Sequence, residues 1–186
     1  MMIEVVVAIV ILTIALLAVM AGYDSAFVSL HDSSQKSVAA TLANKQLELY
    51  SALPYTAIGL NPTITANVGN SSNAAYDALY ATNSILNGTW YTNGSGQQVE
   101  NPSGTVNDVT YASCTSTAPA CLPIQTVTGP DGRTYRIETF IVSVNPDSSN
   151  VRWPLLDVTV IVRDPTRSGD PELIEAETGF DNTAIT

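Results

Sequence analysis

The stretch from Val5 to Ala21 reads VVVAIVILTIALLAVMA, and Thr13 is its only polar residue. Together with the preceding Met1–Ile3, this apolar run is interrupted only by Glu4. A helix of about twenty residues, rising about 1.5 Å per residue, can cross the roughly 30 Å hydrocarbon core of a bilayer. We therefore interpret residues 1–22 as a transmembrane helix.

This segment has three ordinary interpretations: a secretory signal peptide, a buried core helix and a plain membrane anchor. A secretory signal peptide begins with a basic region and ends at a small-residue cleavage site, whereas no Lys or Arg precedes this run. A buried core helix rarely needs such an unbroken apolar length. A plain membrane anchor would hold Glu4 at the membrane surface, where the helix dipole favours a carboxylate. The plain anchor is the alternative that the composition leaves open.

Residues 2–12, MIEVVVAIVIL, resemble the N-terminal motif of type IV pilins and type II secretion pseudopilins. A mature chain of that family commonly begins Phe-Thr-Leu-Ile-Glu, so Ile3 and Glu4 take the places of its isoleucine and glutamate. On this alignment a leader ending in glycine and one further residue are expected before Met1, or the start was assigned at an internal Met. The resemblance implies cleavage by a prepilin peptidase, N-terminal methylation and an assembly role for Glu4.

The helix is expected to continue out of the membrane through residues 23–53, because apolar residues recur at helical intervals until Pro54. Gly22 is the expected place for a bend or local unwinding. Residues 35–55, QKSVAATLANKQLELYSALPY, resemble minor pilins of the PilV type and pseudopilins of the GspI type. The stripe predicted to cover a sheet consists of Val38, Leu42, Leu49 and Leu53.

Residues 54–121 form a polar region rich in Asn, Ser, Thr and Gly, which predicts variable loops with a short helix over residues 74–86. Three Asn-x-Ser/Thr patterns make glycosylation a candidate, although such patterns also arise by chance in so polar a segment. The candidate acceptors are Asn70, Asn87 and Asn93.

Residues 122–186 alternate as strands do and predict an antiparallel meander of about four strands. The expected strands are Leu122–Thr128, Thr134–Val144, Leu155–Val162 and Glu172–Phe180, and Pro130-Asp131-Gly132 is a strong turn signal between the first two. The amphipathic half of the helix can cover the face that carries Val158, Val160 and Val162. The predicted class is therefore α+β, with a pilin-like arrangement of one long helix on a sheet.

The charges argue against several classes of function. Seven Lys and Arg against seventeen Asp and Glu give a formal charge of −10, so direct nucleic-acid binding is not expected.

His31 is the only histidine and has no recognisable catalytic partners. Asp164, Asp170 and Glu172 are oxygen ligands suited to calcium, but a solvated acidic turn containing Arg167 is the favoured interpretation. We expect no enzyme activity and no cofactor.

Cys114 and Cys121 enclose six residues, and in an exported domain two cysteines most simply form a disulfide.

The expected role is a structural subunit, a minor pilin or pseudopilin, of a type IV pilus or type II secretion-like filament. The alternatives are a major pilin or a membrane-anchored exported binding domain. Expected partners are other subunits, the inner-membrane assembly platform, the prepilin peptidase and membrane lipid. The chain would be a single-pass protein of the cytoplasmic membrane, with its head outside the cytoplasm, and then part of a surface or periplasmic filament.

Overall fold

The computed structural model describes residues 2–67, 90–92, 98–100, 109–115, 117–144 and 155–181. The chain divides into two compact units, Met1–Ser37 and Val38–Thr186. The first unit is the N-terminal part of the long helix α1, and the second contains the rest of α1 and the sheet. The α+β class predicted from the sequence is confirmed.

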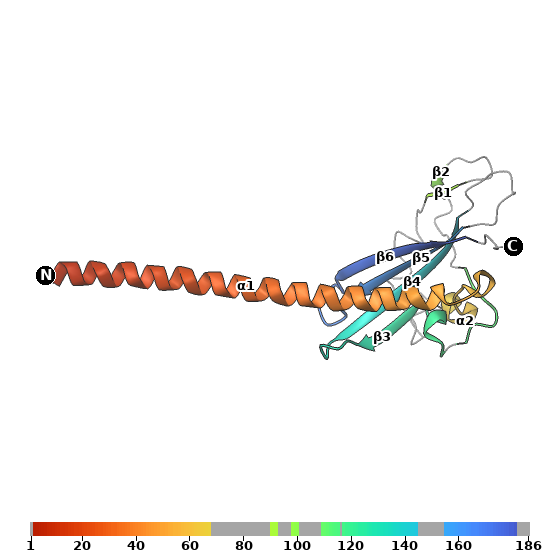
Figure 1. The fold of residues 1–186 in the computed structure, drawn as a ribbon, viewed down its shortest axis with the longest axis horizontal. Helices are drawn as coiled ribbons and strands as arrows, with labels where there is room; N and C mark the ends of the chain where they lie inside the picture. The colour runs from red at the N-terminus through yellow and green to blue at the C-terminus, as the bar shows by residue number, and fades with distance from the viewer. Residues whose placement is uncertain are drawn as a thin grey trace. The chain divides into compact units, whose positions relative to one another are not determined.

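Helix α1 runs from Met2 to Ser51 without interruption (Figure 1). It passes through Gly22, so the local unwinding expected there does not occur. The glycine costs only about 1 kcal/mol relative to alanine, and good helix formers on both sides propagate the helix across it. The helix ends two residues before the predicted position, because Pro54 disfavours helical geometry in the residue before it and Leu53 N turns back to Tyr50 O at 3.0 Å.

Four strands form an antiparallel sheet in the order β3-β4-β5-β6 (Figure 1). Their bounds are Ile124–Thr128, Thr134–Val144, Leu155–Arg163 and Glu172–Phe180, within two residues of the sequence prediction. The turn between β3 and β4 contains Gly132, whose φ of +76° is a conformation that glycine adopts at little cost. Pairing of Ile141 with Val158 and of Val160 with Ala176 fixes the register across the three long strands.

The helix packs on the expected face of the sheet, and Val38, Leu42 and Leu53 of the predicted stripe contact this core, whereas Leu49 does not belong to it. Within Val38–Ser51, its most buried positions, spaced at helical intervals, are Ala39, Ala43, Gln46 and Tyr50. Val38, Leu42 and Leu53 are only partly buried at the margins of the core, and Leu49 is half-buried outside it. The small alanine side chains allow the helix backbone to approach the sheet closely, so the larger leucines flank the contact.

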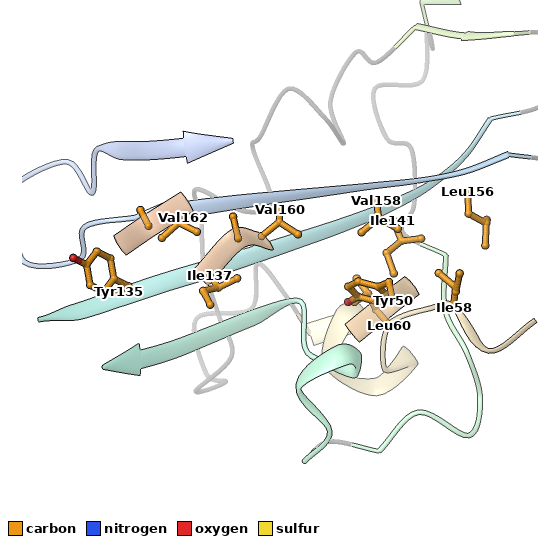
Figure 2. Close-up of a cluster of buried hydrophobic side chains, with 12 residues drawn as sticks. Tyr50, Ile58, Leu60, Tyr135, Ile137, Ile141, Leu156, Val158, Val160 and Val162 are labelled. Carbon is orange, nitrogen blue, oxygen red and sulfur yellow. The ribbon is translucent and has the colours of Figure 1, made fainter. Parts of the chain in front are cut away.

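The sheet side of this core matches the sequence prediction. The side chains of Val158, Val160 and Val162 are completely buried (Figure 2). They pack in one cluster with Tyr50, near the end of α1, and with Ile58, Leu60, Tyr135, Ile137, Ile141 and Leu156 (Figure 2). Removing such a cluster of side chains from water supplies the principal stabilisation of a fold of this kind, at about 1.5–3 kcal/mol for each large apolar residue.

The opposite face of the sheet is also partly buried, which the expectation of one covered face did not include. Phe140, Val142, Thr159 and Ile161 are all buried there, together with Glu138. The reason lies in the sequence of β4, where Phe140, Ile141 and Val142 follow one another without a polar residue. Such a run is typical of a strand that is buried on both faces.

The segment between α1 and the sheet contains short elements. These are η1 (Tyr55–Ala57), α2 (Pro62–Asn67), the paired strands β1 (Trp90–Thr92) and β2 (Gln98–Glu100), and η2 (Pro119–Cys121). The side chain of Asn61 caps α2, because its Oδ1 accepts hydrogen bonds from the N–H groups of Thr63 and Ile64, both at 3.0 Å. The helix predicted over residues 74–86 and the candidate glycosylation sites Asn70, Asn87 and Asn93 lie outside the described residues.

Candidate functional site

The N-terminal part of α1 exposes an apolar surface that water does not favour. Every large apolar side chain from Met2 to Leu30 is at least 51% exposed. By length and composition α1 is long and apolar enough to cross a membrane, and no part of its most apolar 18-residue window is buried. An exposed apolar N-terminal helix of this length suggests a membrane anchor or signal sequence, and it is the first candidate functional segment.

Thr13 is the only polar residue between Val5 and Ala21, and its side chain is hydrogen-bonded within the helix. The hydroxyl of Thr13 donates to the carbonyl oxygens of Ile9 and Val10, at 2.6 and 3.0 Å. The backbone N–H and C=O groups are also hydrogen-bonded within the helix. Transfer of the segment from water to an apolar environment therefore costs little free energy for its polar groups. Glu4 lies in the first turn of α1 and is exposed. It is the one charged side chain among the first 22 residues of the chain.

The three calcium candidates are engaged by other groups of the chain. Asp170 Oδ2 lies 2.7 Å from Arg136 Nη1, and Glu172 Oε2 lies 4.0 Å from Arg163 Nη2. Asp164 Oδ1 accepts hydrogen bonds from the N–H and the hydroxyl of Thr166, at 3.0 and 2.5 Å. Among the described residues, no three His, Cys, Asp or Glu side chains are grouped so as to hold a metal ion. Each of the three carboxylates therefore has a partner within the chain.

A buried carboxylate between two arginines lies at the centre of this region. Glu138 on β4 is completely buried, and its Oε2 lies 2.8 Å from Nε of Arg163 on β5. Its Oε1 lies 3.0 Å from Nη2 of Arg136. Arg136 also reaches Asp170, so the network ties the turn between β5 and β6 to the sheet. Sequence reasoning missed it, although Arg136 and Glu138 stand two apart on one strand and so share a face.

A pair of carboxyl groups lies on the same face, across β5 and β6. Burial raises the pKa of Asp157 to about 7, and a hydrogen bond with Glu177 adds to the shift. Burial also raises the pKa of Glu175, with the negative charges of Glu172 and Glu177 as further causes. These groups repel one another when ionised, so one proton held between Asp157 and Glu177 stabilises the pair.

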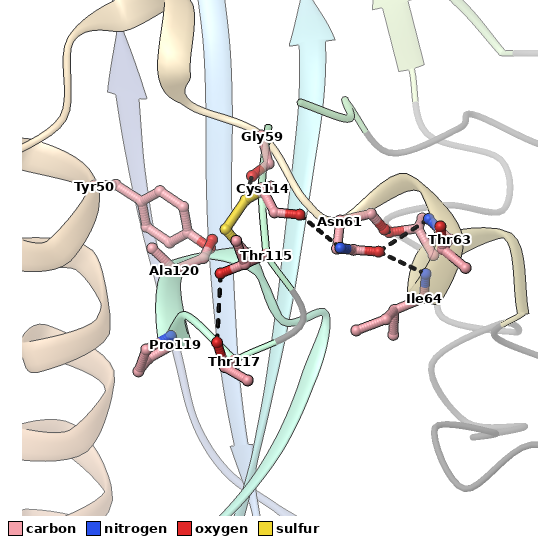
Figure 3. The surroundings of a disulfide bond; sticks show 12 residues. Tyr50, Gly59, Asn61, Thr63, Ile64, Cys114, Thr115, Thr117, Pro119 and Ala120 are labelled. Atoms are coloured by element: carbon pink, nitrogen blue, oxygen red, sulfur yellow. Dashed lines mark hydrogen bonds between the residues drawn. A yellow bond between two sulfur atoms is a disulfide. The ribbon is translucent and has the colours of Figure 1, made fainter. Parts of the chain in front are cut away.

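Cys114 and Cys121 form the predicted disulfide, with Cα atoms 5.4 Å apart (Figure 3). Both cysteines are buried, and the bond closes the segment that precedes β3. The hydroxyl of Tyr50 on α1 donates to the carbonyl oxygen of Ala120 at 2.7 Å. His31, the remaining candidate for chemistry, is exposed on α1.

Comparison of the chain with protein-family models, with curated proteins and with solved structures finds no match. The architecture is the evidence that bears on classification. A 50-residue N-terminal helix with an apolar first half continues into a segment that packs on a four-stranded antiparallel sheet. This arrangement is consistent with a pilin-like architecture.

Proposed function

We propose that this chain is a structural subunit, a minor pilin or pseudopilin, of a type IV pilus or type II secretion-like filament, and that it polymerises through the apolar half of α1. The observation that carries the proposal is the exposure of every large apolar side chain from Met2 to Leu30. A surface of this extent is far larger than the scattered apolar side chains found on ordinary soluble proteins. It requires an apolar partner along its whole length.

Two partners can cover this surface in succession. Membrane lipid covers it first, because the run up to Ala21 matches the thickness of a bilayer core. Copies of the same helix cover it after the subunit enters a filament, through side-chain packing between long parallel helices. The head formed by the sheet stays in water in both states, and in this proposal it lies on the extracytoplasmic side.

Glu4 gives the proposal its chemical specificity. An isolated carboxylate in an apolar filament core would be very costly, so it requires a positive partner there. In the resembled family that partner is thought to be the N-terminal amine of a neighbouring subunit. Their attraction would be strong in a medium of low dielectric constant and would set the axial register of the incoming subunit.

The proposal includes the partners of such a subunit. A prepilin peptidase would mature the chain, an inner-membrane assembly platform would receive it, and other pilin or pseudopilin subunits would pack against α1. The role is structural, with no catalytic step and no cofactor.

Photo-crosslinking in the native host tests the proposal. A photoreactive phenylalanine analogue replaces Val10 in the apolar half, and a matched variant carries it at Thr41 on the exposed side of the docked half. After irradiation, sheared filaments should contain adducts between the analogue at position 10 and other subunits of pilin size. Adducts with lipid alone, together with absence of the chain from the sheared fraction, would support a plain membrane anchor instead.

A further inference from the structure

The outer edge of strand β6 is open within the part of the chain that the structure describes. β6 stands last in the order of the sheet, and its antiparallel pairing with β5 uses only one of its two edges (Figure 1). None of the residues of β6 is fully buried. The N–H and C=O groups that point away from β5 can therefore pair with a further strand, as exposed sheet edges do when they bind extended peptides.

Most features that usually block such an edge are missing from β6. With nine residues it is longer than a typical strand, and it contains neither proline nor lysine. The pairing of β5 with β6 is irregular between Val162 and Arg163, near the start of β6, and is regular from Ile174 to Phe180. The regular stretch, residues 174–180, is where a further strand would fit.

One face of this stretch is acidic. Glu175 and Glu177 are exposed and stand two apart, so their side chains lie on the same face, which Asp157 of β5 shares. Burial, and after it the negative charges of Glu172 and Glu177, raises the pKa of Glu175. Cationic side chains on an added strand would lie directly opposite these carboxylates and relieve their repulsion.

The other face of the same stretch is apolar. Ile174, Ala176 and Phe180 are partly buried and pack against the main core. An added strand would place every second side chain beside these residues, and apolar side chains there would remove further apolar surface from water. The two faces together therefore fit a strand in which cationic and apolar residues alternate.

This sequence does not itself supply such a strand. Antiparallel pairing of β6 with β6 of a second copy would bring two rows of glutamates together, and like charges opposite each other destabilise a strand pair. None of the seven Lys and Arg residues lies two positions from another, so no segment of the sequence alternates cations. Arg136 and Arg163 are also engaged by Glu138.

We propose that the outer edge of β6, from Ile174 to Phe180, is a docking site for an extended basic segment of another protein, which adds to the sheet as a further strand. In this segment Lys or Arg alternates with apolar residues. Its cations meet Glu175 and Glu177, and its apolar side chains extend the core beside Ala176. The inference is independent of the filament role, because it concerns an edge of the head and not the apolar half of α1.

A defined peptide tests whether the edge accepts a strand. The probe is fluorescein-labelled Lys-Val-Lys-Val-Lys-Val-Lys, and its binding to the full chain in nonionic detergent micelles is measured by fluorescence anisotropy at low salt, with empty micelles as the blank. We expect saturable binding, and slower hydrogen exchange of the segment Glu172–Phe180 when the peptide is bound. Absence of saturable binding would overturn the proposal.

Two N-methylated forms of the peptide test the backbone pairing. One form is methylated at the lysine nitrogens of the main chain and the other at the valine nitrogens. Alternate N–H groups of a strand point to opposite edges, so one form should bind about tenfold more weakly than the parent peptide and the other should bind like it. Equal binding of the two forms would show that no strand has been added, and would overturn the proposal.

A pair of double variants separates this site from general attraction between a basic peptide and an acidic chain. Glu175→Gln/Glu177→Gln removes two charges from β6, and Asp24→Asn/Glu48→Gln removes two charges from exposed positions of α1. All four changes keep the size of the side chain, and Tm verifies that both variants are folded. We expect the β6 variant to bind the parent peptide about tenfold more weakly and the α1 variant to bind it like wild type. Equal weakening in both variants would overturn the proposed site.

Discussion

Arg163 and Glu138 face each other across β5 and β4, with Nε of the arginine 2.8 Å from Oε2 of a carboxylate that is completely buried. Arg136 holds the other carboxylate oxygen. Burial removes water from all three groups, so each side chain depends on the others for compensation of its charge. This network fixes the turn that the sequence offered as a calcium candidate.

The first prediction follows from that dependence. Glu138→Gln keeps the size of the side chain but leaves two arginines partly buried without their central negative charge. Removal of one partner of a buried ion pair typically costs about 3–5 kcal/mol of unfolding free energy. Chemical denaturation of the full chain in micelles should show a loss of this order for Glu138→Gln. Glu48→Gln, on the exposed side of α1, should change stability by less than about 0.5 kcal/mol, and equal losses would refute the buried network.

A second prediction concerns the close approach of α1 to the sheet. Ala43 is completely buried in the docking stripe, so Ala43→Leu overfills the contact and should cost about 1–3 kcal/mol. Ala26→Leu places the same side chain on an exposed part of α1 and is the matched control. Thermal denaturation of the head should show a lower Tm for Ala43→Leu alone. A Tm unchanged by Ala43→Leu would contradict the assignment of the stripe.

A third prediction uses the tight contact at Gly59. A Cβ atom at this position would lie 2.8 Å from the backbone nitrogen of Tyr111, next to the parallel bridge between Leu60 and Thr110. Gly59→Ala must therefore displace the backbone and should lower the Tm of the head. Gly22→Ala meets nothing within 4 Å and should not lower it. Equal Tm values for these two variants would show that the backbone contact is not tight in solution.

The pH dependence of stability gives a fourth prediction, centred on Asp157. The pKa of this carboxyl is about 7 in the folded chain, against an ordinary value of 3.8. The folded state thus binds the proton more tightly than the unfolded state, so the stabilisation is complete below about pH 4 and is lost as the pH rises through about 7. Relative to wild type, Asp157→Asn should become progressively more stable between pH 4 and pH 8, as measured by Tm. A difference between the two proteins that does not vary with pH would be evidence against the raised pKa.

Much of the fold could be predicted from the sequence because it rests on local patterns. The apolar run up to Ala21, the proline at position 54 and the alternation within Leu155–Val162 each act through neighbouring residues. The sheet and the covering helix follow from these patterns. The disulfide follows from the presence of two cysteines in an exported domain.

The details that could not be predicted depend on contacts between distant segments. The helix docks through Ala39 and Ala43, because close backbone approach outweighs the larger apolar area of the leucines beside them. Hydropathy alone favours the leucines. In the same way, the calcium interpretation could not include Arg136, which lies 34 residues before Asp170 in the sequence. Only the register of the sheet brings these side chains together.

The central claim is that the apolar half of α1 assembles subunits and that Glu4 guides this assembly. The most direct measurement compares Glu4→Ala with Glu48→Ala in cells, using membrane fractionation and immunogold counts on sheared filaments. Glu4→Ala should remain in the membrane with an intact head but enter filaments much less often than wild type, whereas Glu48→Ala should enter normally. Normal incorporation of Glu4→Ala would contradict the proposed pairing, and its loss from the membrane fraction would instead make Glu4 a residue that sets membrane topology.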